Sequence, residues 1–299
     1  MTNILVVAGE HLRPHVERHL PDLAADQLLC EPQAKGTAPA LAWAAREIIR
    51  RSRRPNETVM ISLHSDHVIR PLDTFSSTLD QAVEGAGILD RLLTVGVMPS
   101  RPEPGYGYIE VGAPLIPAVF EVKRFVEKPD QATAEDYIST GDFVWNSGMF
   151  VWRPQVLLAE LAGHTPELAS DLARLETEDV QGFFAAVPPL TIDHGLMERS
   201  DNIAVVKSEF DWDDVGAWDA LMRVRELDDQ GNLRIGDAHA KDCQNSLIFA
   251  EDGPVVAFGI SDLVVVRASG ITFIMPADRA ANLKALLEEL PENLKKGVD

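Results

Sequence analysis

The sequence predicts an α/β protein with a Rossmann-like, mainly parallel sheet, followed by a small C-terminal β unit and a terminal helix. Short apolar runs alternate with amphipathic helical patterns over the first third of the chain. These runs are apolar at almost every position, which is typical of strands that helices cover on both faces. A second set of short apolar runs, near the end of the chain, predicts the separate β unit.

Two helices and three strands are expected in the first part of the chain. A strand at residues 3–8 precedes a helix at residues 12–20, in which apolar side chains recur every fourth position. A second helix, at residues 37–54, ends in a basic cluster, which suits the negative end of the helix dipole. Further buried strands are expected at residues 59–63 and 92–97.

The middle of the chain, residues 105–152, has a different character. It contains the extended, aromatic and glycine-rich segments GYGYIEV, EVKRFVEKP and FVWNSGMFVW. Ligands of open α/β sheets bind beyond the carboxyl ends of the strands. We therefore expect these segments to form a substrate pocket beside the sheet.

Two domains are expected, a catalytic domain over residues 1–225 and a small β domain with a C-terminal helix over residues 226–299. The first domain is not divided, because the later helical patterns and the segment DWDDVGAW should pack on the same sheet. The second domain contains four short apolar runs, at residues 246–250, 255–258, 263–266 and 271–275. Its terminal helix would carry Leu283, Leu286 and Leu287 on one face.

Charge and cysteine usage limit the partners of the chain. Its 47 acidic and 27 basic residues give a formal net charge of −20, which opposes binding to nucleic acid and anionic lipid. Cys30 and Cys243 match no metal-ligand spacing, so we expect reduced thiols. No signal-peptide pattern begins the sequence, and no apolar run approaches the ~20 residues of a membrane span. We expect a cytoplasmic protein that binds neither nucleic acid nor a membrane.

Two aspartates stand where a metal-bound phosphate would lie in such a sheet. Asp66 follows the strand at residues 59–63, and Asp214 lies on a turn far along the chain. Distant carboxylates commonly converge on Mg²⁺ where phosphate oxygens are bridged, whereas an aspartate that caps a loop is the alternative. His64 and His67, beside Asp66, are expected to be hydrogen-bonding residues rather than zinc ligands.

A charged pair and two glycine-containing segments indicate a sugar-phosphate site. Glu127 and Lys128 end an alternating strand, where a lysine suits a phosphate and a glutamate suits sugar hydroxyls. Gly107, Asn146 and Gly148 lie in segments that combine close backbone approach with aromatic and amide groups. From these residues alone, a solvated strand edge, a turn and a buried strand remain alternatives.

Seven segments, taken in order, resemble the mannose-1-phosphate guanylyltransferase family of sugar nucleotidyltransferases. They are EPQAKGTAPALAWAA, SLHSDHVI, GYGYIEV, FVEKPD, WNSGMFVWRP, IDHGLMERSDNIAVV and DWDDVGAWDAL. The resemblance extends from about Ile4 to the C-terminus, and the later runs GDAHAKDCQNSLIF and ISDLVVV resemble the small β domain of that family.

The resemblance implies a reaction and a site. Members of the family join GTP and mannose 1-phosphate, with Mg²⁺ as the metal, and release pyrophosphate. The implied catalytic residues are Asp66 and Asp214 for the metal and Lys128 for the sugar phosphate. The implied substrate-binding residues are Glu31, Thr37 and Ala38 near the base, and Gly107, Glu127, Asn146, Gly148 and Asp193 near the sugar.

The sequence departs from the family in its phosphate loop. Members normally carry a strand that leads into a glycine-rich loop of the form GGxGTRLWPLSR, which wraps the triphosphate, and the sequence given contains no such segment. We therefore expect full activity to require that loop or a substitute. Three arrangements would account for the central strand: residues 3–8 take its place, a partner chain covers the gap, or the sequence is a shortened form of a longer protein.

Two alternative functions remain open. The chain could be another sugar-1-phosphate nucleotidyltransferase, because a few pocket side chains tune selectivity without changing the fold. Lys35 and Gly36 stand where the family often has Arg-Asn, which leaves the base open. It could also be a non-catalytic regulatory protein that binds a sugar nucleotide. The apolar β unit and the leucine stripe of the terminal helix would support a homodimer.

Overall fold

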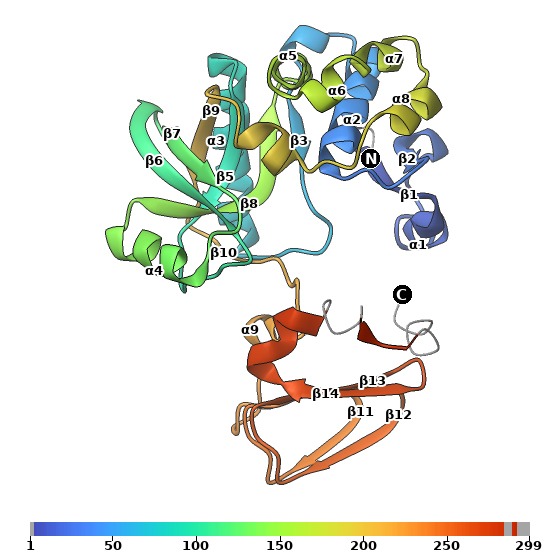
Figure 1. The fold of residues 1–299 in the computed structure, drawn as a ribbon, viewed down its shortest axis with the longest axis vertical. Coiled ribbons are helices and arrows are strands. Elements are labelled where there is room, and N and C mark those ends of the chain that lie inside the picture. Colours follow the sequence, from blue (N-terminus) through green and yellow to red (C-terminus); the bar gives the residue numbers. More distant parts are fainter. Residues whose placement is uncertain (1–2, 284–288, 292–299) are drawn as a thin grey trace. The chain divides into compact units, whose positions relative to one another are not determined.

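The computed structural model describes residues 3–283 and 289–291 (Figure 1). The chain divides into two compact units, one comprising Met1–His64 and Arg70–Phe210, and the other Ser65–Ile69 and Asp211–Asp299. Residues 211–225 are thus grouped with the second unit. The expected domain boundary at residue 225 stays a prediction, because the division into compact units does not test where a folding domain ends.

A six-stranded mixed sheet organises the first unit, in the order β3-β8-β5-β9-β7-β6. Its strands are β3 (Met60–Ser62), β5 (Leu92–Val97), β6 (Gly107–Ile116), β7 (Val119–Val126), β8 (Phe143–Trp152) and β9 (Ile203–Lys207). Among the described pairs, β5 and β9 run parallel and the others antiparallel. The α/β class is confirmed, but the sheet is mixed rather than mainly parallel, because β8 enters antiparallel between β3 and β5.

The segment FVWNSGMFVW forms β8, which lies within the sheet between β3 and β5. The expectation that this segment lies beside the sheet is therefore wrong. Nine of its ten residues are buried. A strand with helices on both faces has no polar side to show, and it therefore reads as a continuous apolar run. That signal is present in the sequence, although the asparagine and glycine within it resemble a loop.

Helices cover both faces of the six-stranded sheet. They are α2 (Thr37–Arg51), α3 (Leu72–Leu89), α4 (Gln131–Thr140), α5 (Pro154–His164), α6 (Pro166–Ala169), α7 (Leu172–Glu176) and α8 (Val180–Ala186). Alternate residues of a strand point to opposite faces. On β9, Ile203 and Val205 pack with the cluster that contains α2 and α5, whereas Ala204 and Val206 pack with the cluster that contains α3. This layering fixes the strands that carry the candidate site.

A separate two-stranded parallel sheet is formed by β1 (Val6–Gly9) and β2 (Leu28–Glu31), with α1 (Arg13–His19) between them in the chain. Within residues 3–283, neither strand pairs with the six-stranded sheet, of which β3 is an edge strand. The arrangement in which residues 3–8 take the central strand's place is therefore wrong. β1 pairs with β2 instead. In the chain, α2 separates β2 from β3.

Short 3₁₀ and related turns connect these elements. They are η1 (Glu10–Leu12), η2 (Ala25–Gln27), η3 (Pro55–Glu57), η4 (Asp193–Met197) and η5 (Ala277–Asn282), of which η4 is π-helical. The expected helices at residues 12–20 and 37–54 are confirmed as α1 and α2. In the parts of the chain that the structure describes, no helix is both long and apolar enough to cross a membrane.

The second unit holds the expected small β unit. Its elements are β4 (Val68–Arg70), β10 (Asp211–Asp213), α9 (Ala220–Val224), β11 (Leu233–Lys241), β12 (Leu247–Phe258), β13 (Leu263–Ala268) and β14 (Ile271–Pro276). β4 pairs with β10, β11 to β13 are parallel, and β14 is antiparallel to β13. Leu283 packs against the core of this unit. Leu286 and Leu287 of the expected terminal helix lie outside the described residues.

Trp152 tests whether β8 is held by its buried aromatic residues. Its side chain is fully buried and stacks on Phe150 with 5.1 Å between ring centroids. Trp152→Ala should lower the free energy of unfolding by about 3–5 kcal/mol, because the lost ring leaves a cavity. Ile61→Ala, on neighbouring β3 at a site that is 40% exposed, should cost less than about 1 kcal/mol. Urea denaturation followed by circular dichroism measures both, and equal losses would contradict this account.

Candidate functional site

Asn146 is held at both ends of its amide inside the first unit. Its Nδ2 donates a hydrogen bond to Asp193 Oδ1 at 2.9 Å. Its Oδ1 accepts hydrogen bonds from Thr94 Oγ1 at 3.0 Å and from the Gly148 amide at 3.2 Å. These contacts join β8 to β5 and to the turn η4, so two of the predicted sugar-binding residues come together and the orientation of the amide is fixed.

Two glycines of the candidate site leave room for their neighbours. Gly107 pairs with Asn146 across β6 and β8, and a Cβ at Gly107 would lie 2.5 Å from Glu127 Oε2. Gly148 has a φ of +70°, and a Cβ there would lie 2.9 Å from His64 Nε2. A side chain at either position would displace a polar neighbour, so the sequence needs glycine at both.

Glu127 and Asp193 form an acidic pair beside Lys128. The Glu127 side chain is 11% exposed, and its Oε1 lies 3.4 Å from Lys128 Nζ. Burial raises the pKa of Glu127, and the charge of Asp193 raises this pKa further. Burial likewise raises the pKa of Asp193. Two carboxyl groups that are buried near each other do little to stabilise a fold. Carboxyl groups whose pKa is shifted by burial and by a neighbouring charge are common at functional sites.

The expected base-binding segment is tied to the same turn. The Thr37 hydroxyl accepts a hydrogen bond from the Ile192 amide at 2.8 Å, and the Ala38 amide donates to the Leu190 carbonyl at 3.1 Å. Glu31 ends β2 nearby in sequence, where burial raises its pKa. Its buried Oε1 has no hydrogen-bond partner among the described residues. The start of α2 and the turn that begins at Asp193 are therefore adjacent.

The two predicted metal-binding aspartates lie in the second unit, close in sequence to the paired strands β4 and β10. Asp214 follows β10 directly, and its Oδ1 accepts a hydrogen bond from the Gly216 amide at 3.1 Å. Neighbouring Asp213 accepts a hydrogen bond from Arg223 Nε at 2.7 Å and is buried. The Arg223 contact gives Asp213 a structural role, which favours Asp214 as the metal-binding member.

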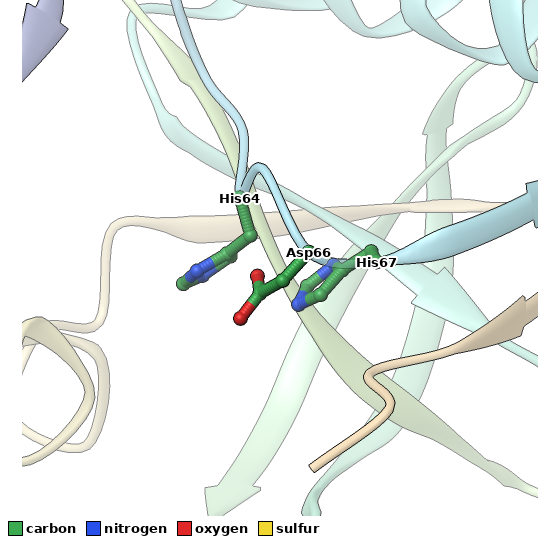
Figure 2. Close-up of side chains that lie close together, drawn as sticks. All are labelled: His64, Asp66 and His67. Carbon is green, nitrogen blue, oxygen red and sulfur yellow. The ribbon is translucent and has the colours of Figure 1, made fainter. Parts of the chain in front are cut away.

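His64, Asp66 and His67 lie close together on one loop (Figure 2), with one ligand atom of each within 4.8 Å of the others. The three side chains come from four consecutive residues, so their proximity follows from the course of this loop alone. His67 Nδ1 accepts a hydrogen bond from Trp212 Nε1 at 3.0 Å, so the proton of a neutral ring lies on Nε2. His67 is thus a hydrogen-bonding residue, as expected, and a metal ion would have to displace the indole or that proton.

Two residues of the site were missed by the sequence analysis. Glu198 Oε1 accepts a hydrogen bond from the Glu127 amide at 3.0 Å, and Glu198 Oε2 lies 2.8 Å from His194 Nδ1. Both residues belong to the π-helical turn η4 or its end, where the Glu198 amide donates to the Asp193 carbonyl at 2.9 Å. No periodic pattern marks such a turn in a sequence.

Two family models match the chain. The model described as "Nucleotidyl transferase" matches residues 1–231. The model described as "MannoseP isomerase/GMP-like beta-helix domain" matches residues 240–290, which include most of the second unit's sheet.

Similar proteins agree with these matches. A mannose-1-phosphate guanylyltransferase of Klebsiella pneumoniae is 33% identical over 97% of this chain and 64% of its own length. The xanthan biosynthesis protein XanB of Xanthomonas campestris is 35% identical over 96% of this chain and 62% of its own length. The chain therefore spans a little under two thirds of these relatives.

A solved structure extends the likeness to three dimensions. It comes from Thermus thermophilus, is described as a mannose-1-phosphate geranyltransferase, and is 30% identical with a TM-score of 0.84. The alignment covers 95% of this chain and 83% of that chain. The mixed α/β sheet, the following β unit and the match over residues 1–231 lead to one conclusion: this chain belongs to the nucleotidyl transferase family.

Proposed function

We propose that this chain transfers the guanylyl group of GTP to mannose 1-phosphate, giving GDP-mannose and pyrophosphate. One observation carries the proposal: Glu127 and Lys128, Asn146, and Asp193, which come from three separate segments of the sequence, form one polar cluster. Relatives named mannose-1-phosphate guanylyltransferase, from Klebsiella pneumoniae and Escherichia coli, support this choice of substrates.

The polar cluster suits a sugar phosphate. Carboxylate oxygens at Glu127 and Asp193 can accept hydrogen bonds from sugar hydroxyls, and the second N–H of the Asn146 amide can donate one. Lys128 Nζ, on a side chain that is 63% exposed, can neutralise the phosphate attached to the same sugar. Glu127, Asp193 and Asn146 would orient the sugar ring, and the exposed ammonium group of Lys128 would contact its phosphate.

The proposed reaction is an in-line displacement. A phosphate oxygen of mannose 1-phosphate attacks the α-phosphorus of GTP and forms a new phosphorus–oxygen bond. The bond from the α-phosphorus to the bridging oxygen of the β-phosphate breaks, and pyrophosphate leaves with the electron pair. No covalent enzyme intermediate is needed, because positioning and charge neutralisation supply the rate enhancement. Lys128 reduces the repulsion between the attacking phosphate and the triphosphate.

Nucleotidyltransferases of this family typically use a divalent metal ion, and we propose Mg²⁺ held by Asp66 and Asp214. Their carboxylate oxygens are the hard ligands that this ion prefers. When bound, Mg²⁺ would supply positive charge that offsets the negative charge of the phosphate groups. The pairing of β4 with β10 supports the assignment, because it joins the two segments that carry these aspartates.

Glu31 supports guanine as the base. A carboxylate can accept hydrogen bonds from both N1–H and the N2 amino group of guanine, and a buried oxygen without a partner gains most from such a ligand. Thr37 and Ala38, which we assign to the same base-binding segment, are anchored to residues 190–192. The segment would thereby place the nucleotide next to the sugar.

The proposal also includes a cytoplasmic location, where GTP and sugar phosphates are made, and a homodimer. Val256, Phe258 and Ile274 of the C-terminal sheet are 76%, 66% and 65% exposed, which supports association through the β unit.

The net charge of −20 supports the expectation that nucleic acid and membranes are not partners.

Turnover is the direct test of the proposed reaction. Pyrophosphate release from GTP and mannose 1-phosphate with Mg²⁺ should fall about 10²- to 10³-fold in Lys128→Met, since one preorganised cation is lost. Asp214→Ala should abolish release, because the metal loses a ligand. Lys123→Met, at a site that is 58% exposed on the same hairpin, should leave release unchanged and serves as the control.

The outcome also separates the alternatives. The assay is run at high enzyme concentration, because the glycine-rich segment is not in the sequence. Binding of GDP-mannose without pyrophosphate release would support the non-catalytic regulatory function. Faster release with another nucleotide or sugar phosphate would support a different nucleotidyltransferase of the same fold.

Base selection by Glu31 can be measured with ITP, which lacks the N2 amino group of guanine. The wild type should prefer GTP over ITP by about tenfold or more, the usual effect of one hydrogen bond to a charged group. Glu31→Ala should reduce this preference to about threefold or less. Glu57→Ala, at a surface ion pair with Arg54, is the matched control and should keep the wild-type ratio. A preserved ratio in Glu31→Ala would exclude the assignment.

Glu127 should make stability depend on pH. Its pKa in the folded chain is raised above the ordinary value of 4.5, so the folded state binds the proton more tightly than the unfolded state. Stability is then lost as the pH rises through the raised pKa. Glu127→Gln should therefore gain free energy of unfolding relative to the wild type as the pH rises from about 4.5 through the raised pKa. Urea denaturation across this range measures the difference.

Glu121→Gln provides the control for this pH series. Glu121 lies on the exposed side of β7, the strand that also leads to Glu127. Because Glu121 is exposed, Glu121→Gln should change the free energy of unfolding less than Glu127→Gln does. A difference between Glu127→Gln and wild type that does not change with pH would show that Glu127 is not buried in its acidic surroundings.

A further inference from the structure

The backbone at Lys128 adopts a conformation that needs support. Lys128 has a φ of +50°, in the left-handed region that non-glycine residues rarely adopt. Pro129 follows directly and restricts the same turn further. Backbone of this kind persists where surrounding contacts determine it, and it is common at ligand-binding sites.

One side chain from another part of the chain holds this turn. Glu198 Oε1 accepts a hydrogen bond from the Glu127 amide at 3.0 Å, across 71 residues of sequence. The Glu127 amide belongs to the peptide unit directly before the Glu127–Lys128 dipeptide, so this contact limits rotation of the segment that carries both charges. An ionised acceptor makes such a bond stronger than a neutral one.

Glu198 is itself oriented from two directions. Its Oε2 lies 2.8 Å from His194 Nδ1, and its side chain is 31% exposed. Its amide donates to the Asp193 carbonyl at 2.9 Å, the i to i+5 bond of the π-helical turn. Asp193 in turn accepts the hydrogen bond from Asn146. The turn at residues 193–198 therefore links the side-chain amide of Asn146 to the loop that carries Lys128.

We propose that Glu198, oriented by His194, is a positioning residue that holds Glu127 and Lys128 in the geometry required for the sugar phosphate. The inference rests on the function proposed above. Glu198 acts through the backbone of Glu127 and is not proposed to touch a substrate. Its removal should therefore weaken use of mannose 1-phosphate, whose ligands move, and affect GTP much less.

Kinetics with both substrates test this role. Glu198→Ala should raise KM for mannose 1-phosphate about 10- to 100-fold, as expected when substrate ligands are misplaced by about 1 Å, and change KM for GTP less than about twofold. Glu198→Gln keeps a carbonyl acceptor for the Glu127 amide and should stay within about threefold of the wild type. Glu167→Ala, which removes the ion pair with neighbouring Arg199, is the matched control and should change neither KM.

Hydrogen exchange gives a readout that does not depend on turnover. Exchange at the Glu127 amide should become about tenfold faster or more in Glu198→Ala, and should remain at the wild-type rate in Glu198→Gln and Glu167→Ala. If Glu198→Ala does not fold, His194→Ala, at a side chain that is 55% exposed, should show the same changes to a smaller extent.

The results separate this inference from the proposed function. A folded Glu198→Ala with wild-type exchange at Glu127 and an unchanged KM for mannose 1-phosphate would overturn the positioning role. Equal increases in both KM values would also overturn it, since they indicate a general loss of structure. Absence of pyrophosphate release in the wild type would refute the proposed reaction, while exchange at the Glu127 amide would still decide whether Glu198 holds the turn.

Discussion

The register of β8 between its neighbours is the constraint on which the candidate site depends. Asn146 faces Gly96 on β5 and Gly107 on β6, so its two neighbours across the sheet have no side chains. The amide therefore turns to Thr94 and Asp193 for its hydrogen bonds. A shift of one residue in β8 would move Asn146 to the other face of the sheet and separate it from both partners.

The acidic cluster shows how the first unit places function above stability. Glu127 and Asp193 are buried beside each other, and the pKa of each is raised by burial. Lys128 and the Asn146 amide offset part of this cost. A fold selected for stability alone would have hydrophobic or oppositely charged side chains here, so the cluster is best explained by a polar ligand.

The proposed sugar-binding residues and the proposed metal-binding residues belong to different parts of the chain. The former lie in the first unit, whereas Asp66 and Asp214 belong to segments grouped with the second. β1 and β2 form their own sheet, separate from β3 in the described chain. The glycine-rich phosphate loop of the family has no counterpart in the sequence given.

The sequence by itself determined the α/β class, the helix that begins at Thr37, the strand at residues 92–97 and the family, because these depend on local periodicity and on short ordered motifs. The tertiary structure decided the place of β8 between β3 and β5, the contact of Thr37 with Ile192 across 155 residues, and the hydrogen bond from the Glu127 amide to Glu198. Such pairings depend on sheet order and on a π-helical turn, which leave no periodic signal in a sequence. The contact of Asp213 with Arg223 is likewise tertiary, since adjacent identical residues differ only in what the fold places beside them.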